Sequence, residues 1–124
     1  MRLDSPLGGD AIVLRTLAPE DVTPGYLAWL HDPDVNRYLE VRFAPPGSLV
    51  QLADFVASAN ASNDTLLLGI FLRAVRRHIG NIKLGPIDRR HSVADIGLLI
   101  GDKAEWGKGH ATAAISLLSD HAFR

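Results

Sequence analysis

The sequence contains no cysteine, and this absence excludes disulfide bonds, thiolate metal sites and a cysteine nucleophile. Because nothing indicates an oxidising compartment, we expect the protein to be cytoplasmic. No segment approaches the roughly 18 consecutive apolar residues that a membrane span requires, so no membrane partner is expected. Thirteen Lys and Arg residues against fourteen Asp and Glu residues leave a formal net charge of -1, which removes the general electrostatic reason to expect nucleic acid.

The composition is that of a soluble globular protein. Of the 124 residues, 47% are hydrophobic and 22% are charged, and no repeat or low-complexity linker divides them. We therefore expect residues 1–124 to form a single domain. The histidines are scattered without metal-ligand spacing, so no metal site is predicted.

The first half of the chain predicts one strand followed by helices. The β-branched run at residues 11–15 predicts a short strand. Three helices are predicted from capping side chains or prolines at their first turns, namely at Thr23-Pro24, at Asp32-Pro33 (with Val35, Tyr38 and Leu39 on one face), and at a capping box formed by Ser48 and Gln51. The last of these helices continues to about Asn60.

The second half predicts an antiparallel meander and a final helix. Residues 65–73 are nearly all apolar, which is typical of a strand covered on both faces. Residues 79–84 and 93–100 predict the next two strands, with Ala94, Ile96, Leu98 and Ile100 sharing one face of the last. A glycine loop over residues 101–109 and a helix from Ala111 follow. The predicted fold class is α/β (α+β), a mixed, mostly antiparallel sheet with flanking helices.

The glycine loop is the most informative segment. A loop between a strand and a helix directs free backbone amides and the positive end of the helix dipole towards one point, which suits a phosphate. Lys108 is followed by Gly109 rather than by Ser or Thr, so the loop is no Walker motif. A dinucleotide fingerprint is excluded because it needs a third glycine and an acidic residue about 20 positions later. On its two glycines alone, a loop that merely turns remains an equal alternative.

The whole arrangement resembles the Gcn5-related N-acetyltransferase superfamily, and most closely its ribosomal-protein-acetyltransferase-like branch. Members share a Gln/Arg-x-x-Gly-x-Gly/Ala loop, where this chain has Trp106-Gly107-Lys108-Gly109-His110-Ala111. Trp106 stands where the superfamily loop has Gln or Arg, and Ala113 stands where the branch often has Glu. Residues 12–15, 79–84 and 95–97 are similar to the opening strand and to the third and fourth strands of the family.

The resemblance implies the acyl-CoA N-acyltransferase fold with its C-terminal part missing. A family domain continues beyond the helix that follows the glycine loop, with a fifth strand, a fourth helix and closing strands. We expect the sequence to be a fragment of a longer protein; a slot completed by a partner chain, as in a homodimer, and a decayed catalyst are the alternatives. An open edge at the last strand also favours self-association.

The resemblance implies acetyl-CoA as co-substrate and assigns residues to it. The backbone of Leu98, Leu99 and Ile100 would bind the pantetheine arm. The pyrophosphate would lie against the loop and helix start formed by Trp106, Gly107, Lys108, Gly109, His110, Ala111 and Thr112. For Lys108 a solvated loop lysine is an equal alternative, and for His110 packing is the better explanation than acid–base work.

Fewer residues can be assigned to catalysis and to the acceptor. Asp95 is the only carboxylate in the strand 93–100 and could draw a proton from the amine, directly or through water; contact with a neighbouring turn or attraction of a cationic substrate is the alternative. Trp29, Tyr38 and Asn81 are predicted to contact the acceptor, with core packing or amide capping as the alternative. No residue can be assigned as the acid that protonates the departing thiolate.

The predicted function is transfer of an acetyl group from acetyl-CoA to a primary amine. The acceptor would be an amino-sugar nucleotide, a protein N-terminus or another small amine. A non-catalytic acyl-CoA-binding or regulatory module is the second possibility, and an interaction domain in which the glycine loop merely turns is the third.

Overall fold

The computed structural model describes residues 1–36, 45–91 and 93–122. Its strands are β1 (Leu7–Gly8), β2 (Ile12–Thr16), β3 (Leu66–Leu72), β4 (His78–Asp88) and β5 (Val93–Ile100). Its helices are α1 (Pro24–His31), α2 (Pro33–Asn36), α3 (Leu49–Ala61) and α4 (His110–Ala122), with short 3-10 helices η1 (Pro19–Asp21) and η3 (Lys103–Glu105). No helix in these ranges is long and apolar enough to cross a membrane.

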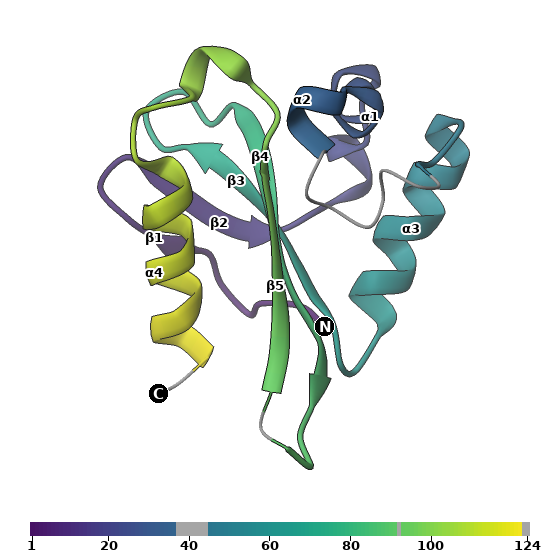
Figure 1. The fold of residues 1–124 in the computed structure, drawn as a ribbon, viewed down its shortest axis with the longest axis vertical. Helices are drawn as coiled ribbons and strands as arrows, with labels where there is room; N and C mark the ends of the chain where they lie inside the picture. The colour runs from purple at the N-terminus through teal and green to yellow at the C-terminus, as the bar shows by residue number, and fades with distance from the viewer. Residues whose placement is uncertain (37–44, 92, 123–124) are drawn as a thin grey trace.

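The five described strands form one sheet in the order β1-β2-β3-β4-β5, and every pairing is antiparallel (Figure 1). This confirms the predicted fold class of a mostly antiparallel sheet with flanking helices, although the described strands include no parallel pair, and it confirms the meander of β3, β4 and β5. The sequence analysis missed β1, because two residues carry no readable alternation of polar and apolar side chains.

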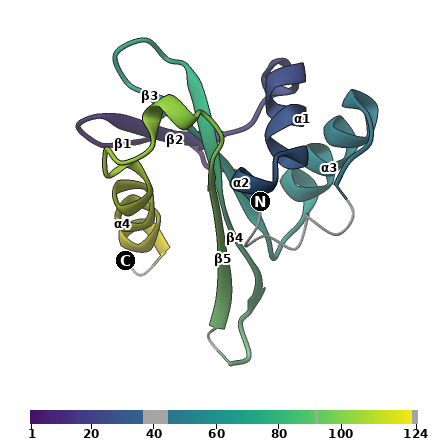
Figure 2. The same cartoon turned by 45° about the horizontal axis from the view of Figure 1, so that its top comes forward.

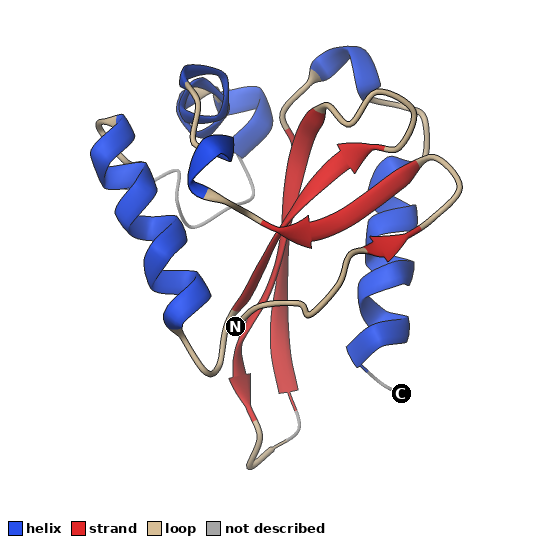
Figure 3. Cartoon of the chain, turned by 180° about the vertical axis from the view of Figure 1, so that it is seen from behind, coloured by secondary structure: helices blue, strands red, loops and turns tan. Residues whose placement is uncertain are grey.

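Helices cover both faces of the sheet. Helix α4 lies on one face, and α1, α2 and α3 lie on the other (Figure 2). The view from behind shows the sheet between the two helical layers (Figure 3). Two apolar cores result, one between α4 and the sheet and one between the sheet and α1 with α3. Strand β3 contributes to both cores and is buried on both faces, as predicted.

Helix starts follow the predicted caps with one correction. The Thr23 hydroxyl accepts a hydrogen bond from the Tyr26 amide at the start of α1, and the Ser48 hydroxyl accepts one from the Gln51 amide at the start of α3, both at 3.2 Å. The predicted capping box of Ser48 and Gln51 is only half formed, because the Gln51 side chain accepts from the Gly47 amide at 2.6 Å. Helix α2 begins at Pro33 as predicted; Tyr38 and Leu39 lie outside the described residues.

The predicted apolar face of β5 is only partly buried. Leu98 and Ile100 pack against the core beneath α4, but Ile96 is 44% exposed and Ala94 is also exposed. The reason is that the β4–β5 hairpin extends past the end of α4, so the outer half of this face is not covered by that helix (Figure 1).

Candidate functional site

The glycine loop connects β5 to α4 and adopts a backbone that only glycine readily supports. Gly107 and Gly109 have φ angles of 78° and 81°, in the left-handed region where a side chain costs about 1–2 kcal/mol. A Cβ atom at either position would meet nothing within 4 Å. The two glycines are therefore required for the path of the chain, and the space beside them is open.

The last backbone amides of this loop and the first of α4 have no partners in the described part of the chain. The N–H groups from Gly107 to Thr112 donate no hydrogen bond to another described residue, and the first helical bond runs from the Ala113 amide to the Gly109 carbonyl at 3.0 Å. They lie at the start of the thirteen-residue helix α4, whose dipole places partial positive charge there. This donor set fits a pyrophosphate group, which accepts several hydrogen bonds and carries negative charge.

The buried Glu105 carboxylate contacts basic side chains of the glycine loop, of the start of α4 and of Arg77. Glu105 is 8% exposed, and its side chain lies 3.0 Å from the Nε2 atom of His110, 3.2 Å from the Lys108 ammonium and 3.5 Å from the Arg77 guanidinium. Hydrogen bonds from His110 and Lys108 lower the pKa of Glu105 below its ordinary value. The side chains of His110 and Lys108, both predicted site residues, thus contact Glu105.

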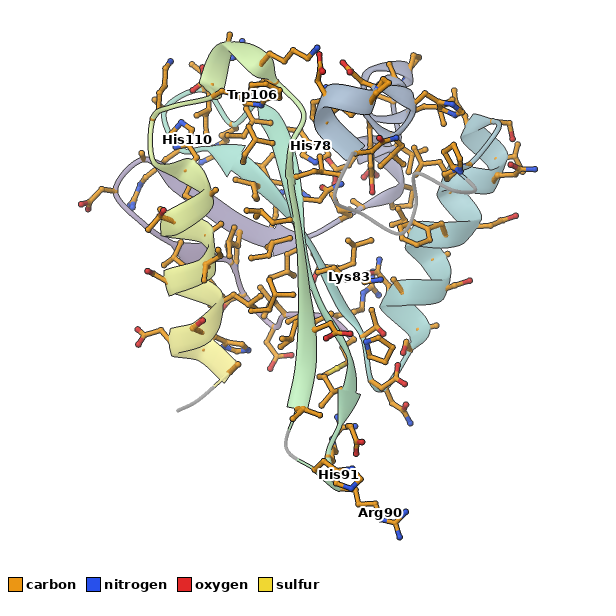
Figure 4. All side chains as sticks on the ribbon, in the orientation of Figure 1. His78, Lys83, Arg90, His91, Trp106 and His110 are labelled. Atoms are coloured by element: carbon orange, nitrogen blue, oxygen red, sulfur yellow. The ribbon has the colours of Figure 1, made fainter. Side chains whose placement is uncertain are left out.

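The sequence analysis missed Glu105, although a signal was present. Glu105 precedes Lys108 by three residues and His110 by five. A tight glycine turn between them can bring both basic side chains back to the carboxylate. Figure 4 shows His110 at the start of α4 and Trp106 in the loop above it.

The start of the loop is held by two tryptophans. The Trp106 indole donates a hydrogen bond to the Ile100 carbonyl at 2.7 Å, while its ring remains 44% exposed. Gly101 lies directly under the ring of Trp29, where any side chain would collide with the indole. Trp29 also contacts the His78 ring, at 5.0 Å between centroids. The structure therefore places Trp29 against the loop start and outside the cavity described below.

Strand β5 leaves one edge of its backbone unpaired among the described strands. Leu98, Leu99 and Ile100 pair with Ile82, Asn81 and Gly80 of β4 on one side. The other edge pairs with no strand in residues 1–36, 45–91 and 93–122. The backbone groups on this edge could receive the amides of a pantetheine arm that begins at the glycine loop.

A cavity of about 360 Å³ lies between the sheet and helices α1 and α3. It brings together four of the predicted site residues, Asn81, Asp95, Leu98 and Leu99, with residues that the sequence analysis did not assign: Tyr26, Leu30, Phe55, Leu67, Lys83, Gly85, Pro86, Ile96 and Gly97. Cross-strand register explains the grouping, because Asn81 lies opposite Leu99 and Lys83 lies opposite Gly97. Tyr38, also predicted here, lies outside the described residues.

Asn81 is held in the cavity wall by His78. Asn81 is 4% exposed, and its Oδ1 atom lies 2.7 Å from the His78 Nε2 atom. The His78 ring packs against the rings of Phe71, Tyr26 and Trp29. Burial lowers the pKa of His78 and raises the pKa of Tyr26. Asn81 is thus positioned by the His78 ring, which is itself packed among aromatic side chains.

No group of three or more His, Cys, Asp or Glu in the described part of the chain lies close enough together to hold a metal ion.

Comparison with known proteins identifies the family. Residues 11–124 match the acetyltransferase (GNAT) domain, so the chain belongs to this acetyltransferase family. The chain is 26% identical over 117 residues to the uncharacterized N-acetyltransferase p20 of Bacillus licheniformis, which covers 92% of this chain and 64% of that protein.

Solved structures share the fold. The spermidine N-acetyltransferase from Vibrio cholerae in complex with CoA and spermine matches with a TM-score of 0.77 at 21% identity, over 93% of this chain and 65% of that one. A GNAT-family acetyltransferase from Bacillus anthracis matches with a TM-score of 0.76 at 16% identity, over 96% and 66% respectively. The chain therefore spans slightly less than two thirds of the length of these relatives.

Proposed function

We propose that the chain binds acetyl-CoA and takes part in transfer of its acetyl group to a primary amine. The observation that carries this proposal is the row of backbone amides from Gly107 to Thr112, which have no partners among the described residues and lie at the start of α4, where the Cβ positions of Gly107 and Gly109 are open. Membership of the GNAT family and a fold shared with a CoA-bound acetyltransferase support it.

The chain's own residues would divide the work of binding. The amides of Gly107 to Thr112 bind the pyrophosphate, and the free edge of Leu98 to Ile100 binds the pantetheine amides. This places the thioester near the cavity, where Asn81 and Asp95 lie. When bound, acetyl-CoA supplies an acetyl group activated as a thioester; the protein supplies position and hydrogen bonds.

Asp95 is the proposed proton acceptor. The acceptor nitrogen must be uncharged to form its bond to the acetyl carbon, so an ammonium has to lose a proton before the carbon–sulfur bond breaks. The Asp95 carboxylate lines the cavity and could take that proton directly or through water. The thiolate that leaves must gain a proton, and no described residue is assigned that role.

The proposal also covers the family branch, the number of domains, the location and the oligomeric state. The Trp-Gly-x-Gly loop supports the ribosomal-protein-acetyltransferase-like branch, whose acceptors include protein N-termini and amino-sugar nucleotides. We propose a single acetyltransferase domain that acts in the cytoplasm, with no nucleic-acid partner. Homodimerisation is proposed from the open edge of β5.

Calorimetric titration of acetyl-CoA into the chain, shown to be folded by circular dichroism, tests the proposal. We expect binding that Gly109→Trp abolishes, because the indole fills the space of the pyrophosphate. Gly25→Trp is the matched control, since Gly25 lies in the first turn of α1 with no crowding atom closer than 3.8 Å to its Cβ position. A folded chain that binds no acetyl-CoA contradicts the proposal, and binding without acetyl transfer to any amine favours the non-catalytic acyl-CoA-binding module.

A further inference from the structure

The cavity contains a lysine that pairs with no described group. Lys83 projects from β4 into the space between the sheet and α3 (Figure 4). The chain's other two lysines each contact a carboxylate, Lys103 that of Asp32 and Lys108 that of Glu105. In contrast, no carboxylate of the described residues lies within 4.0 Å of the Lys83 ammonium, and no described group accepts a hydrogen bond from it.

Asp95 lies near Lys83 without pairing with it. Lys83 is directly opposite Gly97, and Asp95 is two residues from Gly97 on the same face of β5. Such diagonal neighbours have Cβ atoms roughly 7–8 Å apart or less, close enough for one small molecule to contact both side chains. The cavity therefore presents one positive and one negative group, each without an ion-pair partner among the described residues.

The rest of the cavity wall includes several apolar side chains. Leu30, Phe55, Leu67 and Leu99 supply apolar surface around them. A bound group of opposite charge would form a charge-assisted hydrogen bond with each side chain, and such bonds are stronger than those between neutral groups. A ligand with one cationic and one anionic end would satisfy both side chains at once.

Resting on the proposed function, we propose that the acceptor is a primary amine that also carries a phosphate or a carboxylate. Asp95 binds its ammonium group, and Lys83 binds its anionic group and acts as the specificity-determining residue. A polyamine, which has only cationic groups, would meet repulsion from Lys83.

Matched pairs of amines test this inference by direct binding. Glucosamine 6-phosphate is compared with glucosamine, and glycylglycine with glycylglycinamide, so that each pair differs in one anionic group. Binding is followed by NMR chemical-shift titration of the chain, with and without saturating coenzyme A, at the backbone amides of residues 81–83 and 95–99. We expect at least tenfold tighter binding of the anionic member in one of the pairs, and which pair responds distinguishes phosphate from carboxylate.

Variants assign the effect to Lys83. Lys83→Gln should bring the affinity ratio within a pair close to one, Lys83→Arg should retain it, and Lys83→Glu should reverse it. Arg90→Gln is the control, because it removes one positive charge from the exposed tip of the same hairpin (Figure 4). Equal affinities within both pairs, or a preference that survives Lys83→Gln, would overturn the inference. Loss of coenzyme A binding contradicts the proposed function separately, because the acceptor titrations do not depend on it.

Discussion

The indole N–H of Trp106 donates a hydrogen bond to the carbonyl oxygen of Ile100 at 2.7 Å. Ile100 ends β5, and Trp106 begins the glycine segment, so this bond closes the chain from Gly101 to Glu105 into a compact turn. The family loop has Gln or Arg at this place, and here an indole occupies it.

Replacement of Trp106 by Phe should weaken coenzyme binding. The variant keeps an aromatic ring but loses the donor to Ile100, a bond worth about 0.5–1.5 kcal/mol. We expect a loss of unfolding free energy in that range in urea titrations and a several-fold rise in the dissociation constant for acetyl-CoA by calorimetry. Unchanged values of both quantities would show that the bond does not position the loop.

Alanine at Gly107 or Gly109 should destabilise the protein and reduce acetyl-CoA affinity together. Both residues have positive φ, where a Cβ costs about 1–2 kcal/mol. Gly25→Ala is the control, because in the first turn of α1 the same change should stabilise by about 0.4–1 kcal/mol. Urea denaturation and calorimetry measure both effects, and a Gly109→Ala protein as stable as the parent would contradict the backbone argument.

Gly101→Ala should destabilise the chain by overpacking against Trp29. The added Cβ would collide with the indole, and overpacking of this kind costs about 1–3 kcal/mol. Trp29→Leu should relieve the collision, so the double variant should lose less unfolding free energy than the sum of the two single changes. Strict additivity in this double-mutant cycle would mean that the two residues do not press on each other.

Much of the fold could be predicted from the sequence because its signals are local. The apolar run of β3 and the hydroxyl caps at Thr23 and Ser48 need no knowledge of the rest of the chain. The glycine loop was predictable for the same reason, since its positive φ angles leave glycine as the preferred residue at positions 107 and 109.

The contacts made by Trp29, His78 and Lys83 were not predictable because they join residues far apart in the chain. Trp29 meets Gly101 across 72 positions of the chain, and His78 reaches its position only when α1 packs on the sheet. Lys83 gave no signal in its own strand, because its place in the cavity follows from the register of β4 against β5 and from the position of α3. Such contacts are set by tertiary packing and not by local pattern.

Glu105 should make part of the stability dependent on pH. Hydrogen bonds from His110 and Lys108 lower the pKa of this carboxyl in the folded chain below its ordinary value of 4.5. Its contribution is therefore fully present above about pH 4.5 and is lost as the pH falls through the lower folded pKa. In acid titrations of unfolding free energy, Glu105→Gln should show a smaller decline below pH 4.5 than the parent; an identical decline would contradict this origin.

The two faces of β5 present different side chains, and the register set by the turn before β5 decides which of them face the cavity. The Asp88 carboxylate accepts hydrogen bonds from the Arg90 and His91 amides at 3.0 and 3.2 Å, at the exposed tip of the hairpin. Because side chains alternate along a strand, a slip of one residue at this tip would put the Ile96 side chain on the cavity face in place of the Asp95 carboxylate. The charge at the cavity wall is therefore determined partly by a surface turn that lies outside the cavity.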